Sequence, residues 1–201
     1  PEQGHIMIDE DTLMSSGSLE AALYSVGTTT QALDDVIKNV HRNAFAAIRP
    51  PGHHAERGKS MGFCFFNNTA IAALRAADIH HLQRIAILDF DAHQGNGTID
   101  ILQNDQRFLL LSSFQHPFYP YTHYEQNKYT NLINVHLAQG ATGTDFRQGV
   151  EEHWAPALKR FAPELILVSA GFDAHKDDPM AELNFEEQDY AWISQWICNQ
   201  C

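Results

Sequence analysis

The sequence predicts an α/β fold in which helices cover both faces of a mostly parallel sheet, a three-layer α/β/α arrangement. Two observations support this class. Short apolar runs rich in β-branched residues, typical of buried parallel strands, alternate with longer segments of helical periodicity. Three of these runs also end in polar residues, as expected at the carboxyl ends of strands in open α/β sheets. We expect about five strands, at residues 43–48, 85–88, 107–111, 132–135 and 165–169.

The N-terminal part of the chain is expected to hold two helices. Glu2–Thr12 is polar and acidic and predicts no regular element. The Ser-Gly-Ser at residues 16–18 begins a helix, because serine is a favourable cap and apolar residues then recur at helical spacing up to Val40. The Pro-Pro-Gly at residues 50–52 predicts a fixed loop after the first strand, and the alanine-rich segment 67–77 predicts the second helix.

A sharp turn is expected after the strand at residues 85–88. Gly95 and Gly97 favour such a turn, and Thr98 is placed to cap a short helix over residues 99–102. Strand, turn and helix in this order are typical of the βα units of a parallel sheet.

Two further helices are expected in the C-terminal part. Segment 144–161 has one apolar face, and Pro156 should kink or divide that helix. Asn184 and Glu187 have the spacing of a capping box for a last helix, which carries two tryptophans. We assign residues 1–201 to a single domain.

Composition excludes some classes of function. The 201 residues carry a formal net charge of -12 and are 44% hydrophobic, which argues against nucleic acid as the main partner, since such proteins need a basic surface. No apolar stretch approaches the roughly 20 residues of a membrane span, and no signal peptide is visible. Three cysteines without a zinc-binding spacing favour a reducing, cytoplasmic location: Cys64, Cys198 and Cys201.

Polar clusters follow three of the expected strands. His53 and His54 follow the first, and Asp91 and His93 follow the strand at residues 85–88, while Asp173 follows the last. If the strands are parallel, all three clusters lie at one edge of the sheet. Two carboxylates and one imidazole make a metal site with an open position; zinc takes three protein ligands in catalytic sites, and ferrous iron is also compatible. Adjacent histidines in a rigid loop suit a general base and a general acid.

Four motifs in this order resemble the zinc-dependent histone deacetylase family. They are RPPGHHAE at residues 49–56, MGFCFFNN at 61–68, LDFDAHQGNGT at 88–98 and VSAGFDAHKDDP at 168–179. The resemblance is closest to class II-like and bacterial histone deacetylase-like amidohydrolases and to acetylpolyamine amidohydrolases. It implies an arginase/deacetylase-like fold with a larger parallel sheet. With no initial methionine and a last helix that stops at Cys201, we expect a fragment, incomplete at both ends.

The resemblance also implies a role for each matching residue. Asp91, His93 and Asp173 match the zinc ligands, and His53 and His54 match the tandem catalytic histidines. The implied reaction removes acetyl or other short acyl groups from acyl-lysine or acylated amines, by metal-activated water and the histidine pair. The implied partners are acetylated lysine peptides or small acetylated amines and polyamines.

Further matching positions surround this implied centre. Asp89 matches the carboxylate that orients the first histidine, and Asn96 stands where class I members have a second one. Gly62 and Phe63 match the wall of the acyl-lysine tunnel. Asp89 and Ser112, with the backbone of Asp91 and His93, match a structural potassium site.

The chain also departs from the family pattern. The family's transition-state tyrosine lies in a Gly-Gly-Tyr segment that this sequence does not contain, and Gln94 and Phe114 replace common histidines. A metal- or acyl-ligand-binding module without turnover is therefore one alternative. An arginase-like ureohydrolase is another, although it needs a metal-bridging carboxylate where this chain has Gly95.

Overall fold

A four-stranded parallel sheet forms the centre of the structure, with the strand order β5-β4-β3-β6. The computed structural model describes residues 4–121, 128 and 130–200; Cys201 and the first three residues lie outside this part. The strands run over β3 Ile85–Asp89, β4 Phe108–Gln115, β5 Leu132–Leu137 and β6 Leu165–Ser169.

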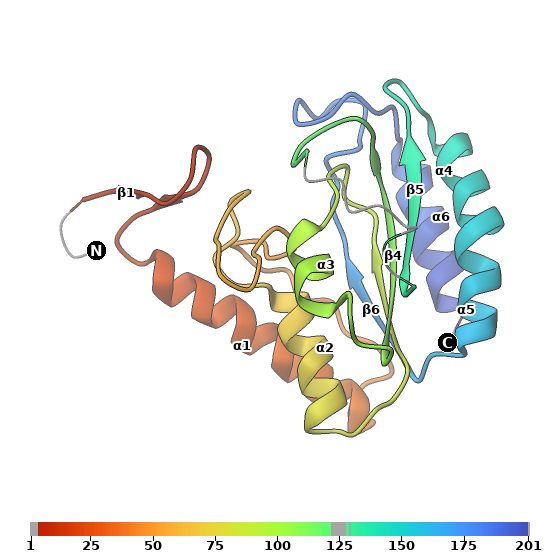
Figure 1. Cartoon of the computed structure of the whole chain (residues 1–201), viewed down its shortest axis with the longest axis horizontal. Helices are drawn as coiled ribbons and strands as arrows, with labels where there is room; N and C mark the ends of the chain where they lie inside the picture. Colours follow the sequence, from red (N-terminus) through yellow and green to blue (C-terminus); the bar gives the residue numbers. More distant parts are fainter. Residues whose placement is uncertain (1–3, 122–127, 129, 201) are drawn as a thin grey trace.

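Helices cover both faces of this sheet and make the three predicted layers (Figure 1). Helices on one side are α1 Ser18–Ile37, α2 Asn68–Asp78 and α3 Asn96–Leu102. Those on the other side are α4 Gly143–Gly149, the π-helical turn η2 Val150–Trp154, α5 Ala155–Phe161 and α6 Glu187–Cys198. None of the helices in the described part of the chain is long and apolar enough to cross a bilayer.

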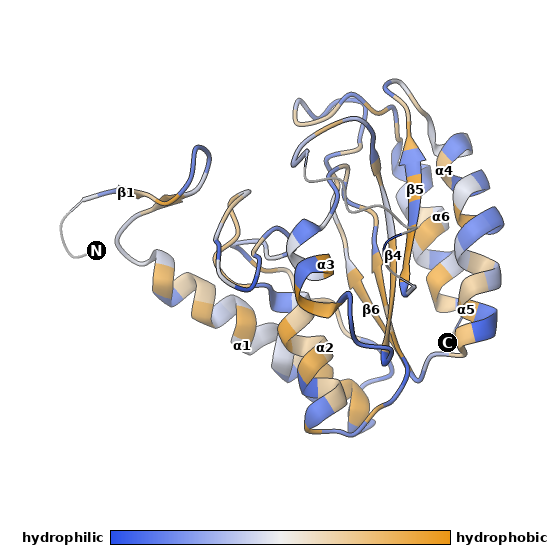
Figure 2. Cartoon of the chain, viewed as in Figure 1, coloured by the Kyte–Doolittle hydropathy of each residue, from blue (hydrophilic) through white to orange (hydrophobic). Residues whose placement is uncertain are grey.

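Alternation along β3 divides the core into two halves. Ile85 and Ile87 belong to the apolar cluster with α2 and α3, whereas Ala86 and Leu88 belong to the cluster with α4, η2 and α6. The strand is buried at every position because it has neighbours on both edges and helices on both faces. Figure 2 shows the same pattern, with hydrophobic residues along the strands and on the helix faces toward the sheet.

The register of the sheet brings its polar residues to one edge. Asp89, the last residue of β3, pairs with Ser112 of β4 and Ser169 of β6. The loops that leave β3 and β6 therefore start side by side, and residues 91–93 come close to residue 173.

The first strand prediction is wrong. Residues 43–48 form no regular element, and the side chain of Phe45 is 75% exposed. An apolar run forms a strand only where a neighbouring strand pairs with it, and this one has none among the described residues. Conversely, β1 Ile6–Met7 lies within residues 2–12, where we predicted no regular element, and pairs antiparallel with β2 Leu13–Met14 just after them.

Two predicted helix caps are also wrong. The short helix begins at Asn96, and the hydroxyl of Thr98 is instead hydrogen-bonded to Asn67 at 3.1 Å. The capping box of α6 is formed by Glu186 and Asp189. Asn184 donates to the Gly140 carbonyl oxygen at 3.0 Å and is therefore occupied outside the helix.

The predicted division of the helix at Pro156 is confirmed. The chain forms α4, then the π-helical turn, and then α5, with the proline in its first turn. Proline has no backbone N–H, and a wider turn before it removes the need for that donor.

Candidate active site

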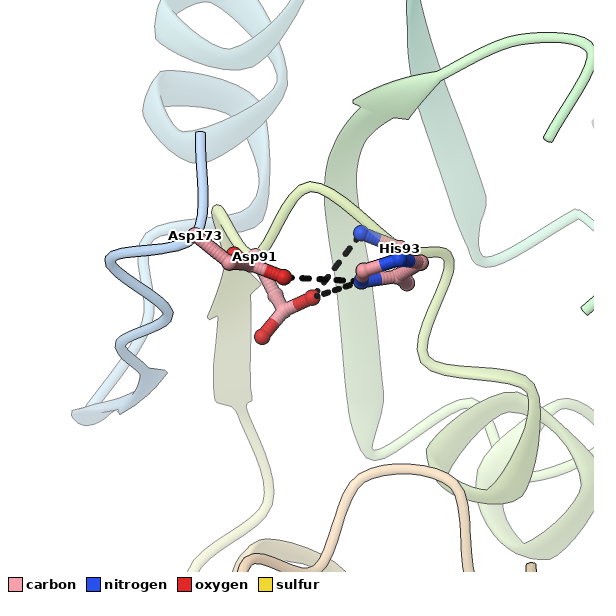
Figure 3. Close-up of side chains that lie close together, drawn as sticks. All are labelled: Asp91, His93 and Asp173. Carbon is pink, nitrogen blue, oxygen red and sulfur yellow. Dashed lines mark hydrogen bonds and ion pairs between the residues drawn. The ribbon is translucent and has the colours of Figure 1, made fainter. Parts of the chain in front are cut away.

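The three predicted metal ligands converge at the polar edge of the sheet. His93 Nδ1 lies 2.7 Å from an oxygen of Asp173 and 3.1 Å from an oxygen of Asp91 (Figure 3). One ligand atom from each residue lies within 4.8 Å of the others. Asp91 and His93 come from the loop after β3, and Asp173 comes from the loop after β6. One nitrogen and two oxygens at this spacing fit a divalent cation with a position left open.

Backbone hydrogen bonds hold the two carboxylates in place. Asp91 accepts from the His93 N–H at 2.8 Å, and Asp173 accepts from the Ala92 N–H at 3.0 Å. Gly171 packs against Asp91 so closely that a Cβ would collide with it. The ligand atoms are therefore positioned by the loops themselves before any ion binds.

The electrostatics of this cluster without an ion depend on a proton at His93. Burial lowers the pKa of His93, but the hydrogen bonds to Asp173 and Asp91 outweigh burial and raise it to about 10. Burial raises the pKa of Asp173, whereas His53 and His93 overcome burial and lower that of Asp91. The proton on His93 Nδ1 thus occupies the place that a cation would take.

The two adjacent histidines lie beside this cluster, each with its own partner. The Nδ1 of His53 donates to Asp89 at 3.0 Å, and the Nδ1 of His54 donates to the Asn96 side-chain oxygen at 2.7 Å. Both side chains are buried, and their ring centroids are 4.0 Å apart. His53 Nε2 lies 3.8 Å from an oxygen of Asp91. The predicted pairing of the histidines with Asp89 and Asn96 therefore exists in the structure.

These environments shift the two histidine pKa values in opposite directions. Burial lowers the pKa of His53, but the carboxylates of Asp91 and Asp89 outweigh it and raise it to about 9. Burial and the charge on His53 lower the pKa of His54 to about 3. In the absence of a metal, one histidine is charged and its neighbour is neutral at pH 7, a division typical of acid and base pairs.

A rim of backbone and aromatic groups borders the histidines. Gly62 and Phe63 both have left-handed backbone angles, φ 56° and 63°. Gly62 lies against the ring of His54, where a Cβ would collide, and the Phe63 side chain is 49% exposed. Glycine at this position lets the loop approach the histidine directly.

Sequence reasoning missed four residues at this rim. The ring of Phe118 stacks on His93 at 5.3 Å between centroids, and the ring of Tyr119 lies 5.2 Å from that of His54. Asp11 accepts from the Gly62 N–H and Thr12 from the Phe63 N–H, both at 3.1 Å. Phe118 and Tyr119 could have been found from the sequence, because they lie shortly after β4, at the same sheet edge. No sequence pattern pointed to Asp11 or Thr12.

The residues matched to the potassium site are brought together in part. Asp89 and Ser112 are paired across β3 and β4, and both are buried. One oxygen of Asp89 accepts from the Asp91 N–H at 3.2 Å. The hydroxyl of Ser112 has no hydrogen-bond partner among the described residues, which fits a monovalent cation as the missing partner.

Sequence comparison matches nearly the whole chain to a known domain family. A sequence profile of the histone deacetylase domain matches residues 2–201. The chain is 37% identical over 197 residues to the histone deacetylase-like amidohydrolase of Pseudomonas aeruginosa, covering 94% of this chain and 52% of that protein.

Two solved structures share the fold. The HDA15 HD domain matches with a TM-score of 0.93 and 30% identity, over 98% of this chain and 58% of that one. An acetylpolyamine aminohydrolase from Burkholderia pseudomallei matches with a TM-score of 0.87 and 28% identity, over 94% and 56%. The predicted arginase/deacetylase-like fold is confirmed, and the chain spans about half the length of these relatives.

Proposed function

Because the chain belongs to the histone deacetylase family, we propose that it carries the centre of a zinc-dependent amidohydrolase that removes acetyl or other short acyl groups from amines. One observation carries this proposal: the cluster of Asp91, His93 and Asp173 adjoins two histidines whose pKa values are shifted apart. Metal-assisted hydrolysis of an amide at neutral pH combines these two elements, an electrophile and an acid-base pair.

The metal proposed for the cluster is zinc, with ferrous iron as the alternative. The donor set fits either ion, because one imidazole and two carboxylates leave room for substrate and water. When bound, zinc would polarise the amide carbonyl and make water a stronger acid. His93 must give up its Nδ1 proton on binding, while Asp91 and Asp173 keep the backbone hydrogen bonds that aim them. The pair of Asp89 and Ser112 is proposed as part of a potassium site.

The histidines are proposed to divide the proton transfers. His54 donates its Nδ1 proton to Asn96, so its Nε2 is the free acceptor for the proton of the attacking water. His53, held by Asp89 and charged, donates from Nε2 to the departing amine nitrogen. In the metal-free chain the pKa of His54 is about 3 and that of His53 about 9, and this order supports the neutral ring as base and the charged ring as acid.

The rim favours an acyl group on a flexible, cationic amine. Phe63, Phe118 and Tyr119 offer aromatic surface around the histidines, which suits an alkyl stem. The net charge of -12 attracts cationic molecules. Acetylated lysine peptides and acetylated polyamines are therefore the proposed substrates.

The test combines metal analysis with hydrolysis of a fluorogenic acetyl-lysine peptide and an acetylated polyamine. We expect one zinc per chain, with turnover lost in His54→Ala. His41→Ala is the matched control, because His41 is exposed and has no place in the proposed centre. Zinc without turnover would support the binding-module alternative, and urea release from arginine would support the ureohydrolase. Absence of both zinc and iron would contradict the proposed centre.

A further inference from the structure

The orientation of the Asn96 side chain decides which nitrogen of His54 carries the proton. An asparagine amide can present either its oxygen or its NH2 group to a neighbour. If the oxygen faces His54 Nδ1, that nitrogen must be the donor, and Nε2 keeps a lone pair. If the NH2 group faces it, Nδ1 must accept and the proton moves to Nε2, which blocks the proposed base.

Three acceptors surround the other end of this amide. The Nδ2 of Asn96 donates to a Glu56 carboxylate oxygen at 2.7 Å, and it also lies 3.4 Å from the Met61 sulfur and 3.5 Å from the His54 carbonyl oxygen. An ionised carboxylate only accepts hydrogen bonds. The bond to Glu56 is the shortest of the three and the only one to a charge, so it sets the orientation of the amide.

Glu56 is held at this place by its own loop. It is half-buried, and its N–H donates to the Lys59 carbonyl oxygen at 2.9 Å. The neighbouring Ala55 carbonyl lies against Gly97 of α3, where a Cβ would collide, so the loop and the start of the helix are closely packed. Glu56, Asn96 and His54 thus form one continuous chain of hydrogen bonds.

We propose that Glu56 is a positioning residue that fixes the Asn96 amide and, through it, the Nδ1-protonated tautomer of His54. The inference rests on the proposed function of His54 as base, which gives this tautomer its purpose. Asn96 itself is neutral, and Glu56 places a negative charge on the side of its amide that faces away from His54.

The sharpest test replaces the hydrogen-bond acceptor at residue 56 with a donor. Lysine only donates, so in Glu56→Lys the Asn96 oxygen should turn toward the lysine and its NH2 group toward His54. We expect the His54 proton to move from Nδ1 to Nε2, read from the 15N shifts of the ring at pH 8 in the zinc-free 201-residue chain. The double variant Glu56→Lys/Asn96→Asp should return the proton to Nδ1, because an aspartate accepts from both sides. Glu152→Lys makes the same change of charge at an exposed site and should leave His54 unchanged.

A second pair of variants guards against misfolding of the first. Asn96→Asp alone places two carboxylates together and should lower kcat by roughly 10-fold with KM little changed. Adding Glu56→Gln should restore most of this loss, since glutamine can donate to the new aspartate.

The tautomer is readable whether or not the chain hydrolyses amides, so failure of this inference and failure of the proposed function are distinct. His54 remaining Nδ1-protonated in a folded Glu56→Lys variant would overturn the positioning role. If circular dichroism shows that variant to be unfolded, the 15N shifts of Glu56→Gln decide instead, because glutamine can present either its oxygen or its NH2 group to Asn96. We expect a second, Nε2-protonated population of His54 in that variant, and a His54 that stays wholly Nδ1-protonated would overturn the positioning role.

Discussion

His93 Nδ1 and the Asp173 carboxylate, 2.7 Å apart, join the loops that follow two neighbouring parallel strands. A proton holds this contact in the absence of a metal, because the pKa of His93 is raised to about 10. A metal ligand must be neutral imidazole, so the same contact makes metal binding compete with a proton.

Zinc affinity should therefore rise with pH. Below pH 10 the proton must leave His93, and each unit of pH should change the dissociation constant about 10-fold. Calorimetry at pH 7 in two buffers of different ionisation enthalpy should show release of about one proton per zinc. Zinc binding without proton release would mean that His93 is already neutral. Asp173→Asn, which removes one ligand charge, should bind zinc far more weakly.

Asp89→Asn should lower the pKa of His53. The carboxylates of Asp91 and Asp89 raise that pKa to about 9 against the effect of burial, and removing one of them should bring it down by about one unit. Turnover should fall roughly 10- to 100-fold, as for other groups that orient a site residue. NMR titration of the ring in the zinc-free chain measures the pKa, with Asp78→Asn, an exposed aspartate, as control. An unchanged pKa would show that Asp89 does not act on this histidine.

Asp34→Ala should destabilise the fold. Its carboxylate accepts two hydrogen bonds from Arg75 and one from His80, each at 2.8 Å, and links α1 to α2. Losing an acceptor for charged donors costs about 1.5–3 kcal/mol. Urea unfolding at pH 7 measures this loss. Asp35→Ala removes only a hydrogen bond from Gln31 on the same helix and should cost less than about 0.5 kcal/mol.

The ionisation of Asp34 should also make the stability of the fold fall at low pH. The hydrogen bonds from Arg75 and His80 hold the pKa of Asp34 well below its usual range. A carboxyl with a lowered folded pKa stabilises the protein above its unfolded pKa of about 3.9 and loses that contribution as pH falls below it. Wild type and Asp34→Ala should therefore differ at pH 6 and converge toward pH 2. A difference that stays constant over this range would contradict the ionic origin.

Gly97→Ala should disturb the loop that carries His54. A Cβ at this position would collide with the Ala55 and His54 backbone, and forcing an extra methyl into a packed place costs about 1–3 kcal/mol. The melting temperature and zinc-loaded turnover should both fall. Gly58→Ala is the matched control, since a Cβ at Gly58 would meet no atom within 4 Å.

The sequence was a good guide wherever local pattern and tertiary position agree. The strands at residues 85, 107, 132 and 165 were predicted because their apolar runs are buried between helices. Asp91, His93 and Asp173 were expected to lie together because they follow two of these strands, and the structure brings them together. The strand predicted at residues 43–48 failed since a strand also needs a neighbour, which no local pattern reveals.

Long-range polar contacts were the other feature that could not be predicted from the sequence. The hydrogen bonds of Asp11 and Thr12 to the Gly62 and Phe63 backbone span 51 positions, and spacing within a segment carries no information about them. The same holds for Glu56, whose partner Asn96 lies 40 positions away.

The two loops of the metal cluster also give a bound ion a mechanical role. Ala92 and Asp173, hydrogen-bonded to one another, are separated by 81 positions, so an ion held by both loops would connect the two ends of a long stretch of chain. Because such an ion binds the folded chain and not the unfolded one, it would stabilise the fold by an amount that grows with the ratio of its concentration to its dissociation constant. The ion would thus link the loops after β3 and β6 and make the stability of the sheet depend on the supply of metal.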